Sequence, residues 1–436
     1  MEVLYITDSS ANQHNICAIN TGNGQNITSY KGGTSEKNTV CVINDDYIVG
    51  ASPKKAVLNV FELSRKGQHA KKIVTPGVVK SLCVSNDCFH IAAGIEQNVF
   101  LWDLSSGELL ATMSRHYQDV TCLKFTFDGL YLVSSGLDGI VSVWKIMDHI
   151  DISKQDSMKS NEPFRCWSSH ALAVTQVCVS TLGYRVYTSS LDQSVKIHDI
   201  LVGETLLTVV FDTAVTSLAV DSVDFYLYAG GFNGRIYSVD LTASAKKLQR
   251  QNNKSINFET ENSDDTSVQP IQGHTRTVTC LTRNTDCSLV VSGSLDGEVK
   301  VWDVLSGQCL RTVNQKGSIT NLLLTLTPFS LSSVNHKPSV PFPKLAHSVY
   351  DGSETDKSAK LHGLGKGTSH EPSIQSRVDV INSALFDRTD CRNDRGSKSF
   401  DHNAKQEALE REILYLKSEN HKLYEFALNN LVQSQN

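Results

Sequence analysis

A serine or threonine, a histidine and an aspartate recur together three times in this chain, and these are the side chains of a hydrolase triad. In every copy the histidine precedes an aromatic position by 28 residues, the hydroxyl by 10 and the aspartate by 6. The three sets are His116, Ser134, Asp138 and Trp144; His170, Thr188 and Asp192, with His198 at the aromatic position; and His274, Ser292, Asp296 and Trp302.

Repetition favours a structural interpretation of these sets over a catalytic one. A catalytic nucleophile is needed once, whereas this set recurs with the same spacing. An aspartate in a tight turn that accepts from a histidine, which in turn meets a hydroxyl and an indole, satisfies polar groups buried between strands. We therefore expect three structural tetrads and no catalytic site.

The segments that carry the tetrads are copies of a unit just over 40 residues long, the period of the WD repeat. Each copy alternates apolar and polar residues between Gly, Asp or Asn turns, which predicts four short strands and hence one blade of a β-propeller. Two longer steps between copies predict insertions at about 147–165 and 243–270. The aromatic position is occupied by Cys17, Phe61, Trp102, Trp144, His198, Val239 and Trp302.

Seven copies predict an all-β, seven-bladed WD-repeat propeller over residues 1–328. The first copy has too little chain before Cys17 for four strands, so we expect the N-terminal strands and the segment GSITNLLLTLTP (317–328) to complete one shared blade. That closure would remove the open sheet edges. The blades around Phe61, Trp102 and Val239 lack most of the tetrad, and we expect packing alone to hold them.

Composition and motifs argue against several other functions. A net charge of −5 gives no general attraction to nucleic acid, and no apolar run reaches the roughly 18 residues of a membrane helix. No CxxC pair or HExxH motif occurs, and GLGKGTS (363–369) lacks the spacing of a phosphate-binding loop. The sequence thus predicts no metal and no cofactor. The basic stretch AKKLQRQNNK (245–254) is interpreted as a solvated loop, with contact to RNA or a partner left open.

Beyond the propeller, residues 329–402 are rich in Ser, Asp, Lys, Gly and His, which predicts a flexible polar linker. Five of the nine prolines fall at its start or within it. Part of the stretch SVPFPKLAH (339–347) is expected to lie along the closing blade.

Residues 403–433 predict a C-terminal coiled-coil helix. Asn420 at a core a position favours a parallel dimer, and the wider apolar surface near the end favours contact with another protein. The alternative is a helix that folds back on its own propeller. The residues expected to form the dimer or partner surface are Leu409, Ile413, Leu416, Asn420, Leu423, Phe426, Ala427 and Leu431.

The combination of MEVLYITD, the LWDLSSGELL blade and a terminal helix reading LKSENHKLYEFALNNLV resembles the WD-repeat subunit of the rixosome. The resemblance implies a non-enzymatic scaffold of the nucleus, in the nucleolus and nucleoplasm. It implies an α-helical scaffold subunit, other rixosome proteins and the pre-ribosomal large subunit as partners, in processing of the precursor rRNA internal spacer. The alternative is a WD-repeat adaptor in a chromatin, DNA-replication or ubiquitin-ligase complex.

Overall fold

The computed structural model describes residues 2–10, 16–32, 34–65, 71–150, 162–181, 183–242, 255–257, 268–332, 338 and 342–347. The chain divides into two units, Met1–Asp351 and Gly352–Asn436, and every described residue belongs to the first.

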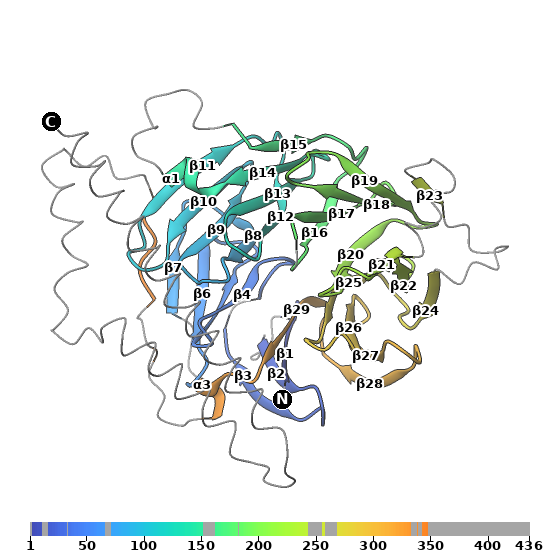
Figure 1. The fold of residues 1–436 in the computed structure, drawn as a ribbon. Coiled ribbons are helices and arrows are strands. Elements are labelled where there is room, and N and C mark those ends of the chain that lie inside the picture. Colours follow the sequence, from blue (N-terminus) through green and yellow to red (C-terminus); the bar gives the residue numbers. More distant parts are fainter. Residues whose placement is uncertain are drawn as a thin grey trace, which may run out of the picture. The chain divides into compact units, whose positions relative to one another are not determined.

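Seven sheets, antiparallel except for one added parallel strand, form a ring of blades around a central axis, which confirms the predicted seven-bladed propeller (Figure 1). Four blades, written from inner to outer strand, are β29(Ile319–Leu326)-β1(Glu2–Asp8)-β2(Ile16–Asn20)-β3(Asn26–Tyr30), β4(Val40–Ile43)-β5(Tyr47–Ala51)-β6(Val57–Glu62)-β7(Lys71–Val74), β8(Val79–Val84)-β9(His90–Ile95)-β10(Asn98–Asp103)-β11(Leu109–Ser114) and β12(Val120–Phe125)-β13(Tyr131–Gly136)-β14(Val141–Lys145)-β15(Arg165–Trp167). The other three are β16(Val174–Val179)-β17(Arg185–Ser190)-β18(Ser194–Asp199)-β19(Thr205–Val210)-β23(Ser255–Asn257), β20(Val215–Val220)-β21(Tyr226–Gly231)-β22(Arg235–Asp240)-β24(Val268–Gln272) and β25(Val278–Arg283)-β26(Leu289–Ser294)-β27(Glu298–Asp303)-β28(Cys309–Asn314).

One blade is assembled from both ends of the propeller sequence, as the sequence predicted. Strand β29 pairs antiparallel with β1, in a register that runs from Glu2 opposite Leu326 to Thr7 opposite Asn321. The backbone N–H of Ser9 also donates to the carbonyl of Ser318 at 2.9 Å. The ring is therefore closed by hydrogen bonds between segments more than 300 residues apart. Strand β1, at the N-terminal end of the propeller, is paired on both sides, with β29 and with β2.

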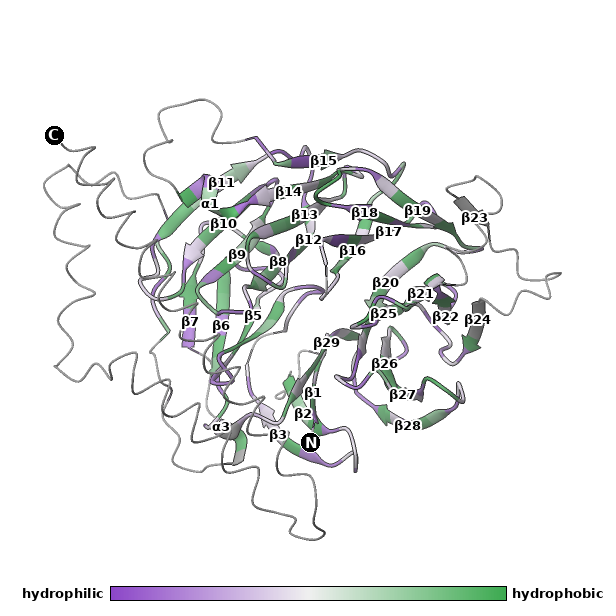
Figure 2. Cartoon of the chain, in the orientation of Figure 1, coloured by the Kyte–Doolittle hydropathy of each residue, from purple (hydrophilic) through white to green (hydrophobic). Residues whose placement is uncertain are grey.

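Hydrophobic residues recur along the strands of the ring (Figure 2). Their side chains form clusters between neighbouring blades. One such cluster joins Ala92 and Val99 of the blade β8–β11 to Leu123 and Trp144 of the next blade, and all four are fully or almost fully buried. A blade alone would expose two apolar faces, as the blade β12–β15 shows by contributing Leu132 to one cluster and Val133 to the next. This packing therefore supplies the main stabilisation of the ring.

The insertions contain structure that the repeat pattern does not predict. A short helix, α1 (Ile146–Ile150), follows β14, and β23 pairs in parallel with β19 as a fifth strand of its blade. A second short helix, α3 (Phe329–Ser332), follows β29. Neither of these two helices, among the residues described, is long and apolar enough to span a membrane.

Part of the stretch 339–347 was expected to lie along the closing blade, and for residues 342–347, which the structure describes, this was wrong. Residues 342–347 lie against the blades β4–β7 and β8–β11 rather than along the closing blade, and Phe342 and Leu345 are each only 5% exposed. Their apolar side chains join the cluster that contains Tyr47 and Trp102. Burial of two large side chains accounts for this docking within a stretch that is otherwise polar.

Candidate functional site

The tetrad of the blade β12–β15 is fully connected. Ser134 Oγ lies 2.8 Å from His116 Nε2 and 2.9 Å from Trp144 Nε1, and His116 Nδ1 lies 3.2 Å from Asp138 Oδ2. The arrangement that satisfies every group has the indole donating to the hydroxyl, the hydroxyl to the imidazole and the imidazole to the carboxylate. Asp138 also accepts the backbone N–H of Tyr117 at 3.0 Å, so it ties the loop before β12 to the β13–β14 turn.

The blade β25–β28 repeats this geometry. Ser292 Oγ lies 2.7 Å from His274 Nε2 and 2.8 Å from Trp302 Nε1, and His274 Nδ1 lies 3.0 Å from Asp296. His274, Asp296 and Glu298 also lie close enough to hold a metal ion. Both ring nitrogens of His274 already have partners in the tetrad, however, which argues against a metal there.

The blade β16–β19 carries the variant in which histidine replaces tryptophan. His170 bridges Asp192 at 2.9 Å and Thr188 at 2.8 Å, and His198 Nε2 lies 3.4 Å from the Thr188 hydroxyl. The His198 ring stacks on Trp167, with centroids 4.5 Å apart. Burial, together with the nearby charges of His170 and Lys196, lowers the pKa of His198 to about 3, so this ring is neutral at physiological pH.

The surroundings of the tetrads suit a structural role and not catalysis. Ser134 and Ser292 are 0% exposed, and each hydroxyl is already engaged by a histidine and an indole, so no substrate carbonyl can reach it. Burial alone would raise the pKa of Asp138. Hydrogen bonds from His116 and from the backbone N–H of Tyr117 and Ile140 outweigh that effect and hold this pKa below its ordinary value.

The prediction that other blades are held by packing alone was wrong for two of them. In the blade around Val239, the Tyr237 hydroxyl donates to Asp212 at 2.5 Å and accepts from Asn233 at 3.0 Å. In the blade β8–β11, the Trp102 indole donates to the backbone carbonyl of Ala346 at 2.7 Å. Different polar groups thus take over the role of the missing tetrads.

One face of the ring carries a stripe of exposed apolar side chains. In four successive blades the turn between the second and third strands places an apolar residue just before its Asp or Asn, at the same position each time. These residues, which we call the turn-face stripe, are Leu137 (45% exposed), Leu191 (41%), Phe232 (62%) and Leu295 (42%). A single exposed apolar residue is ordinary, whereas four at equivalent positions on one face are typical of a protein-binding surface.

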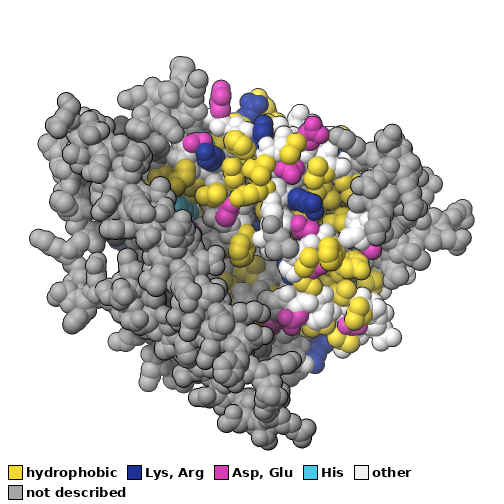
Figure 3. All heavy atoms as spheres, in the orientation of Figure 1, with side chains coloured by type: hydrophobic (Ala, Val, Ile, Leu, Met, Phe, Trp, Pro, Cys, Tyr) yellow, Lys and Arg dark blue, Asp and Glu magenta, His cyan; other side chains and the backbone are white. Residues whose placement is uncertain are grey.

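Figure 3 shows one side of the molecule, where apolar side chains gather in patches between charged groups. The turn-face stripe was not predicted from the sequence. Its signal was nevertheless present in the aligned copies, where Leu or Phe precedes the turn aspartate or asparagine in LD, LD, FN and LD.

The loop between β3 and β4 reaches across the central channel at the same face. Lys37 donates to the carbonyl of Thr216 in β20 at 2.5 Å, and Asn38 donates to the carbonyl of Thr121 in β12 at 3.1 Å. Burial lowers the pKa of Lys37. The loop therefore connects blades that are far apart around the ring.

A cavity of about 300 Å³ lies beside this loop. Glu36 and Lys80, whose charged groups approach to 3.3 Å, form part of its wall together with Leu137 and Leu191 of the stripe. The stripe is thus continuous with a hollow that has both apolar and charged walls, a combination suited to an inserted peptide side chain.

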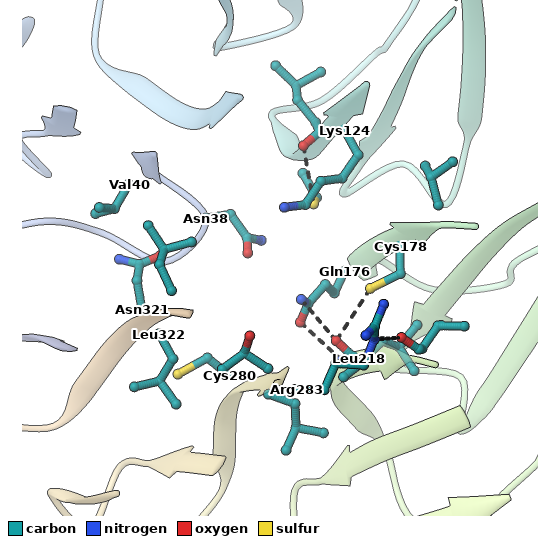
Figure 4. A pocket seen from close by; sticks show the side chains of 18 of the residues that line it. Asn38, Val40, Lys124, Gln176, Cys178, Leu218, Cys280, Arg283, Asn321 and Leu322 are labelled. Carbon is teal, nitrogen blue, oxygen red and sulfur yellow. Dashed lines mark hydrogen bonds between the residues drawn. The ribbon is translucent and has the colours of Figure 1, made fainter. Parts of the chain in front are cut away.

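A second cavity, of about 280 Å³, is lined by the inner strands of all seven blades. Figure 4 shows Lys124 and Arg283 with the amides of Asn38 and Gln176 around it. The Gln176 amide bonds both backbone groups of Leu218, at 3.1 and 3.3 Å, which links β16 to β20. The groups that line this cavity mainly link the inner strands to one another.

The residues expected on the C-terminal helix, Leu409 to Leu431, lie outside the described residues. The same holds for the linker beyond residue 347 and for the basic stretch 245–254.

Comparison with known proteins agrees with the geometry. The family "WD domain, G-beta repeat" matches residues 107–145, 161–199 and 265–303, which are the three repeats that contain the tetrads. The chain is therefore a WD-repeat β-propeller protein.

The chain is 33% identical to WD repeat-containing protein 18 of Danio rerio, over 98% of this chain and 97% of that protein. It is 34% identical to the Homo sapiens protein of the same name over 88% of each chain. It is also 29% identical to pre-rRNA-processing protein IPI3 of Yarrowia lipolytica, over 86% of this chain and 88% of that protein. The chain belongs to the WD repeat-containing protein 18 family, which confirms the predicted resemblance.

Proposed function

We propose that this chain is a non-enzymatic scaffold subunit of a nuclear complex that processes precursor rRNA and supports maturation of the large ribosomal subunit. The observation that carries the proposal is the similarity, over most of the chain, to proteins named for pre-rRNA processing. The internal spacer of the precursor is the segment whose removal the complex would support. The nucleolus and nucleoplasm are the compartments that fit this work.

The structure supports a scaffold in preference to an enzyme. The Ser–His–Asp sets are buried inside blades, and the loop that carries Lys37 bonds across the channel. The turn-face stripe, in contrast, is exposed and lies next to a cavity. We assign to this stripe the binding of an α-helical scaffold subunit, because an apolar row of this kind fits the apolar face of a helix.

Affinity purification of the tagged full-length chain from nuclear extract tests the proposal. Recovery of an α-helical scaffold protein, a processing nuclease and large-subunit precursors by mass spectrometry is the expected result. Depletion of the chain should also cause spacer-containing precursor rRNA to accumulate. Recovery of a ubiquitin ligase, or of a chromatin or replication complex, without precursor subunits would instead assign the chain to the adaptor class.

The proposed homodimer through the C-terminal helix has its own test. Leu416→Asp with Leu423→Asp places charges in the predicted seam, so self-association should be lost while the thermal unfolding of the propeller stays unchanged. Arg411→Asp with Ser418→Asp, at outer positions of the same heptads, is the matched control. Analytical ultracentrifugation distinguishes the two, and a dimer that survives the seam variant would exclude this helix as the interface.

A further inference from the structure

Residues 342–346, Phe-Pro-Lys-Leu-Ala, pack against the blades β4–β7 and β8–β11, and we call the surface that they cover, which includes Tyr47, Lys71 and Trp102, the groove. Phe342 and Leu345 are 5% exposed, whereas Lys344 between them is exposed. The Phe342 ring meets the Tyr47 ring edge-on, with centroids 5.8 Å apart. Two apolar side chains three residues apart therefore anchor this segment, and the lysine between them faces water.

The groove also binds the backbone of the segment. The Trp102 indole donates to the Ala346 carbonyl at 2.7 Å, and the Ala346 N–H donates to the Gly107 carbonyl at 2.8 Å. The Lys71 ammonium donates to the Phe342 carbonyl at 2.9 Å. Backbone hydrogen bonds combined with pockets for alternate side chains are how protein surfaces recognise short extended peptides.

The blade is adapted to accept this segment. The residue ten positions before Trp102 is Ala92, where the tetrads have Ser or Thr, so the indole has no hydroxyl partner there and its N–H is free for Ala346. Gly107 has a φ of +78°, and a Cβ at this position would lie 2.1 Å from the Lys344 carbonyl oxygen. Glycine is thus required both by the turn and by the close approach of the segment.

We propose that this groove is a binding site for short peptides with the pattern Phe-x-x-Leu-Ala, and that residues 342–346 are its built-in, detachable ligand. The segment is held mainly by two apolar side chains and by hydrogen bonds to its backbone. It inserts no strand into a sheet, so it can leave while the propeller stays folded. Occupancy of the groove fixes where the following chain leaves the propeller. A peptide of the same pattern added in trans would displace the segment.

This inference goes beyond the proposed function and does not depend on it. The groove is defined by contacts within this chain, and its test needs no ribosomal component. Failure to recover rRNA-processing partners in the purification would leave the groove proposal intact. Failure of the peptide to bind the groove would likewise leave the proposed function intact.

The test uses full-length protein and a fluorescent peptide of residues 338–350, with binding followed by fluorescence polarisation. In the variant Phe342→Ala with Leu345→Ala the groove is empty, so this protein should bind the peptide. Wild-type protein should bind it at least about tenfold more weakly, because its own segment occupies the groove. A peptide with alanine at both anchors is the matched ligand control and should not bind.

Trp102→Phe, introduced into the empty-groove variant, should weaken peptide binding about five- to tenfold by removing one donor. Trp302→Phe, which removes an indole bonded inside its own blade, should leave the affinity unchanged. Absence of binding to the empty-groove variant, or equal binding by wild type and variant, would overturn the proposal.

Hydrogen exchange of the wild-type protein gives a second test that does not depend on how the variants fold. The Ala346 amide should exchange by local opening, faster than the amides of the neighbouring strand β10. Exchange of Ala346 only together with β10 would show that the segment is a fixed part of the blade, and the detachable ligand would be rejected.

Discussion

In the blade β12–β15 the Trp144 indole donates to Ser134, ten residues away in the same sheet, whereas in the adjacent blade β8–β11 the Trp102 indole donates to Ala346, 244 residues along the chain. Both indoles are completely buried. In the blade β12–β15 the acceptor, Ser134, belongs to a tetrad that is complete within one repeat. In the blade β8–β11 Ala92 stands where that serine would be, and the backbone carbonyl of Ala346 is the acceptor instead.

The difference shows how one buried donor can serve two purposes. A buried N–H needs an acceptor, and an acceptor within the repeat makes the blade independent of the rest of the chain. An acceptor from outside couples the blade to a segment that can move away. We therefore expect the tetrad blades to respond to mutation as rigid structural units and the blade β8–β11 to respond as a binding site.

The largest effect is expected from Asp138→Ala. This change removes a carboxylate that accepts from His116 and from the backbone N–H of Tyr117 and Ile140, so the buried imidazole of His116 loses its partner and two backbone donors lose theirs. The free energy of unfolding should fall by about 3 kcal/mol, measured by urea denaturation.

Glu96→Ala provides the control for Asp138→Ala, because Glu96 has the equivalent position in the blade β8–β11 and is exposed. Its effect should stay within about 0.5 kcal/mol. Equal losses in the two variants would mean that the tetrad contributes nothing special, and the contrast between the two blades would fail.

Phe342→Ala and Leu345→Ala should next show a characteristic lack of additivity. Each change should lower the free energy of unfolding by about 2 kcal/mol, below the usual cost of about 3–5 for Phe→Ala in a core. The loss of unfolding free energy cannot exceed the free energy of docking of residues 342–346. Once a substitution has cancelled that docking free energy the segment detaches, and a further substitution in it has no contact left to remove. The double variant should thus be no less stable than the worse single variant, and full additivity would contradict a detachable segment.

Much of this architecture could be predicted because its contacts repeat. The tetrad residues must meet at fixed strand offsets, so their spacing is the same in each copy and the sequence reveals it. The closing blade could be inferred because the first copy lacks strands before Cys17. Both predictions rest on the geometry of the repeat itself.

The docked segment and the fifth strand could not be predicted in this way. Phe342 and Leu345 lie in a proline-containing stretch without periodicity, and their partners Tyr47 and Trp102 are far away in sequence. The pairing of β23 with β19 is likewise non-local. Contacts of this kind depend on which surfaces the completed ring offers, and local patterns contain no record of that.

A smaller effect, on pH dependence, is expected from His198 in the variant tetrad. Its folded pKa of about 3 lies below the ordinary value of about 6.5, so the folded state favours the neutral ring. The contribution of neutral His198 to the free energy of unfolding is complete above pH 6.5, and it is lost as the pH falls toward 3. It should amount to about 2 kcal/mol lost between pH 8 and pH 5.

His198→Trp restores the side chain that two other tetrads have and removes the titrating group. Urea denaturation at pH 8 and pH 5 should therefore show a smaller loss for the variant than for wild type. An identical loss of unfolding free energy in variant and wild type would mean that the His198 ring is protonated in the folded protein at pH 5, contrary to its burial against Trp167.

The smallest effect on stability is expected at the turn-face stripe, whose exposed side chains belong neither to the tetrads nor to the groove that holds residues 342–346. Phe232→Asp with Leu295→Asp changes side chains that are 62% and 42% exposed, so the free energy of unfolding should shift by no more than about 0.5 kcal/mol. Recovery of the helical scaffold partner should nevertheless fall at least about tenfold, since charges would be buried against its apolar face.

Leu201→Asp with Leu305→Asp is the matched control for the stripe, because these leucines are also exposed, at 51% and 95%, but lie in the turns between third and fourth strands at the opposite ends of their blades. Partner recovery is measured by quantitative mass spectrometry after purification from nuclear extract. Retention by the control and loss by the stripe variant would locate the partner on the turn face. Loss of partner recovery in the control variant alone would place the interface at the other end of the ring. The stripe would then be exposed but would not contact the partner.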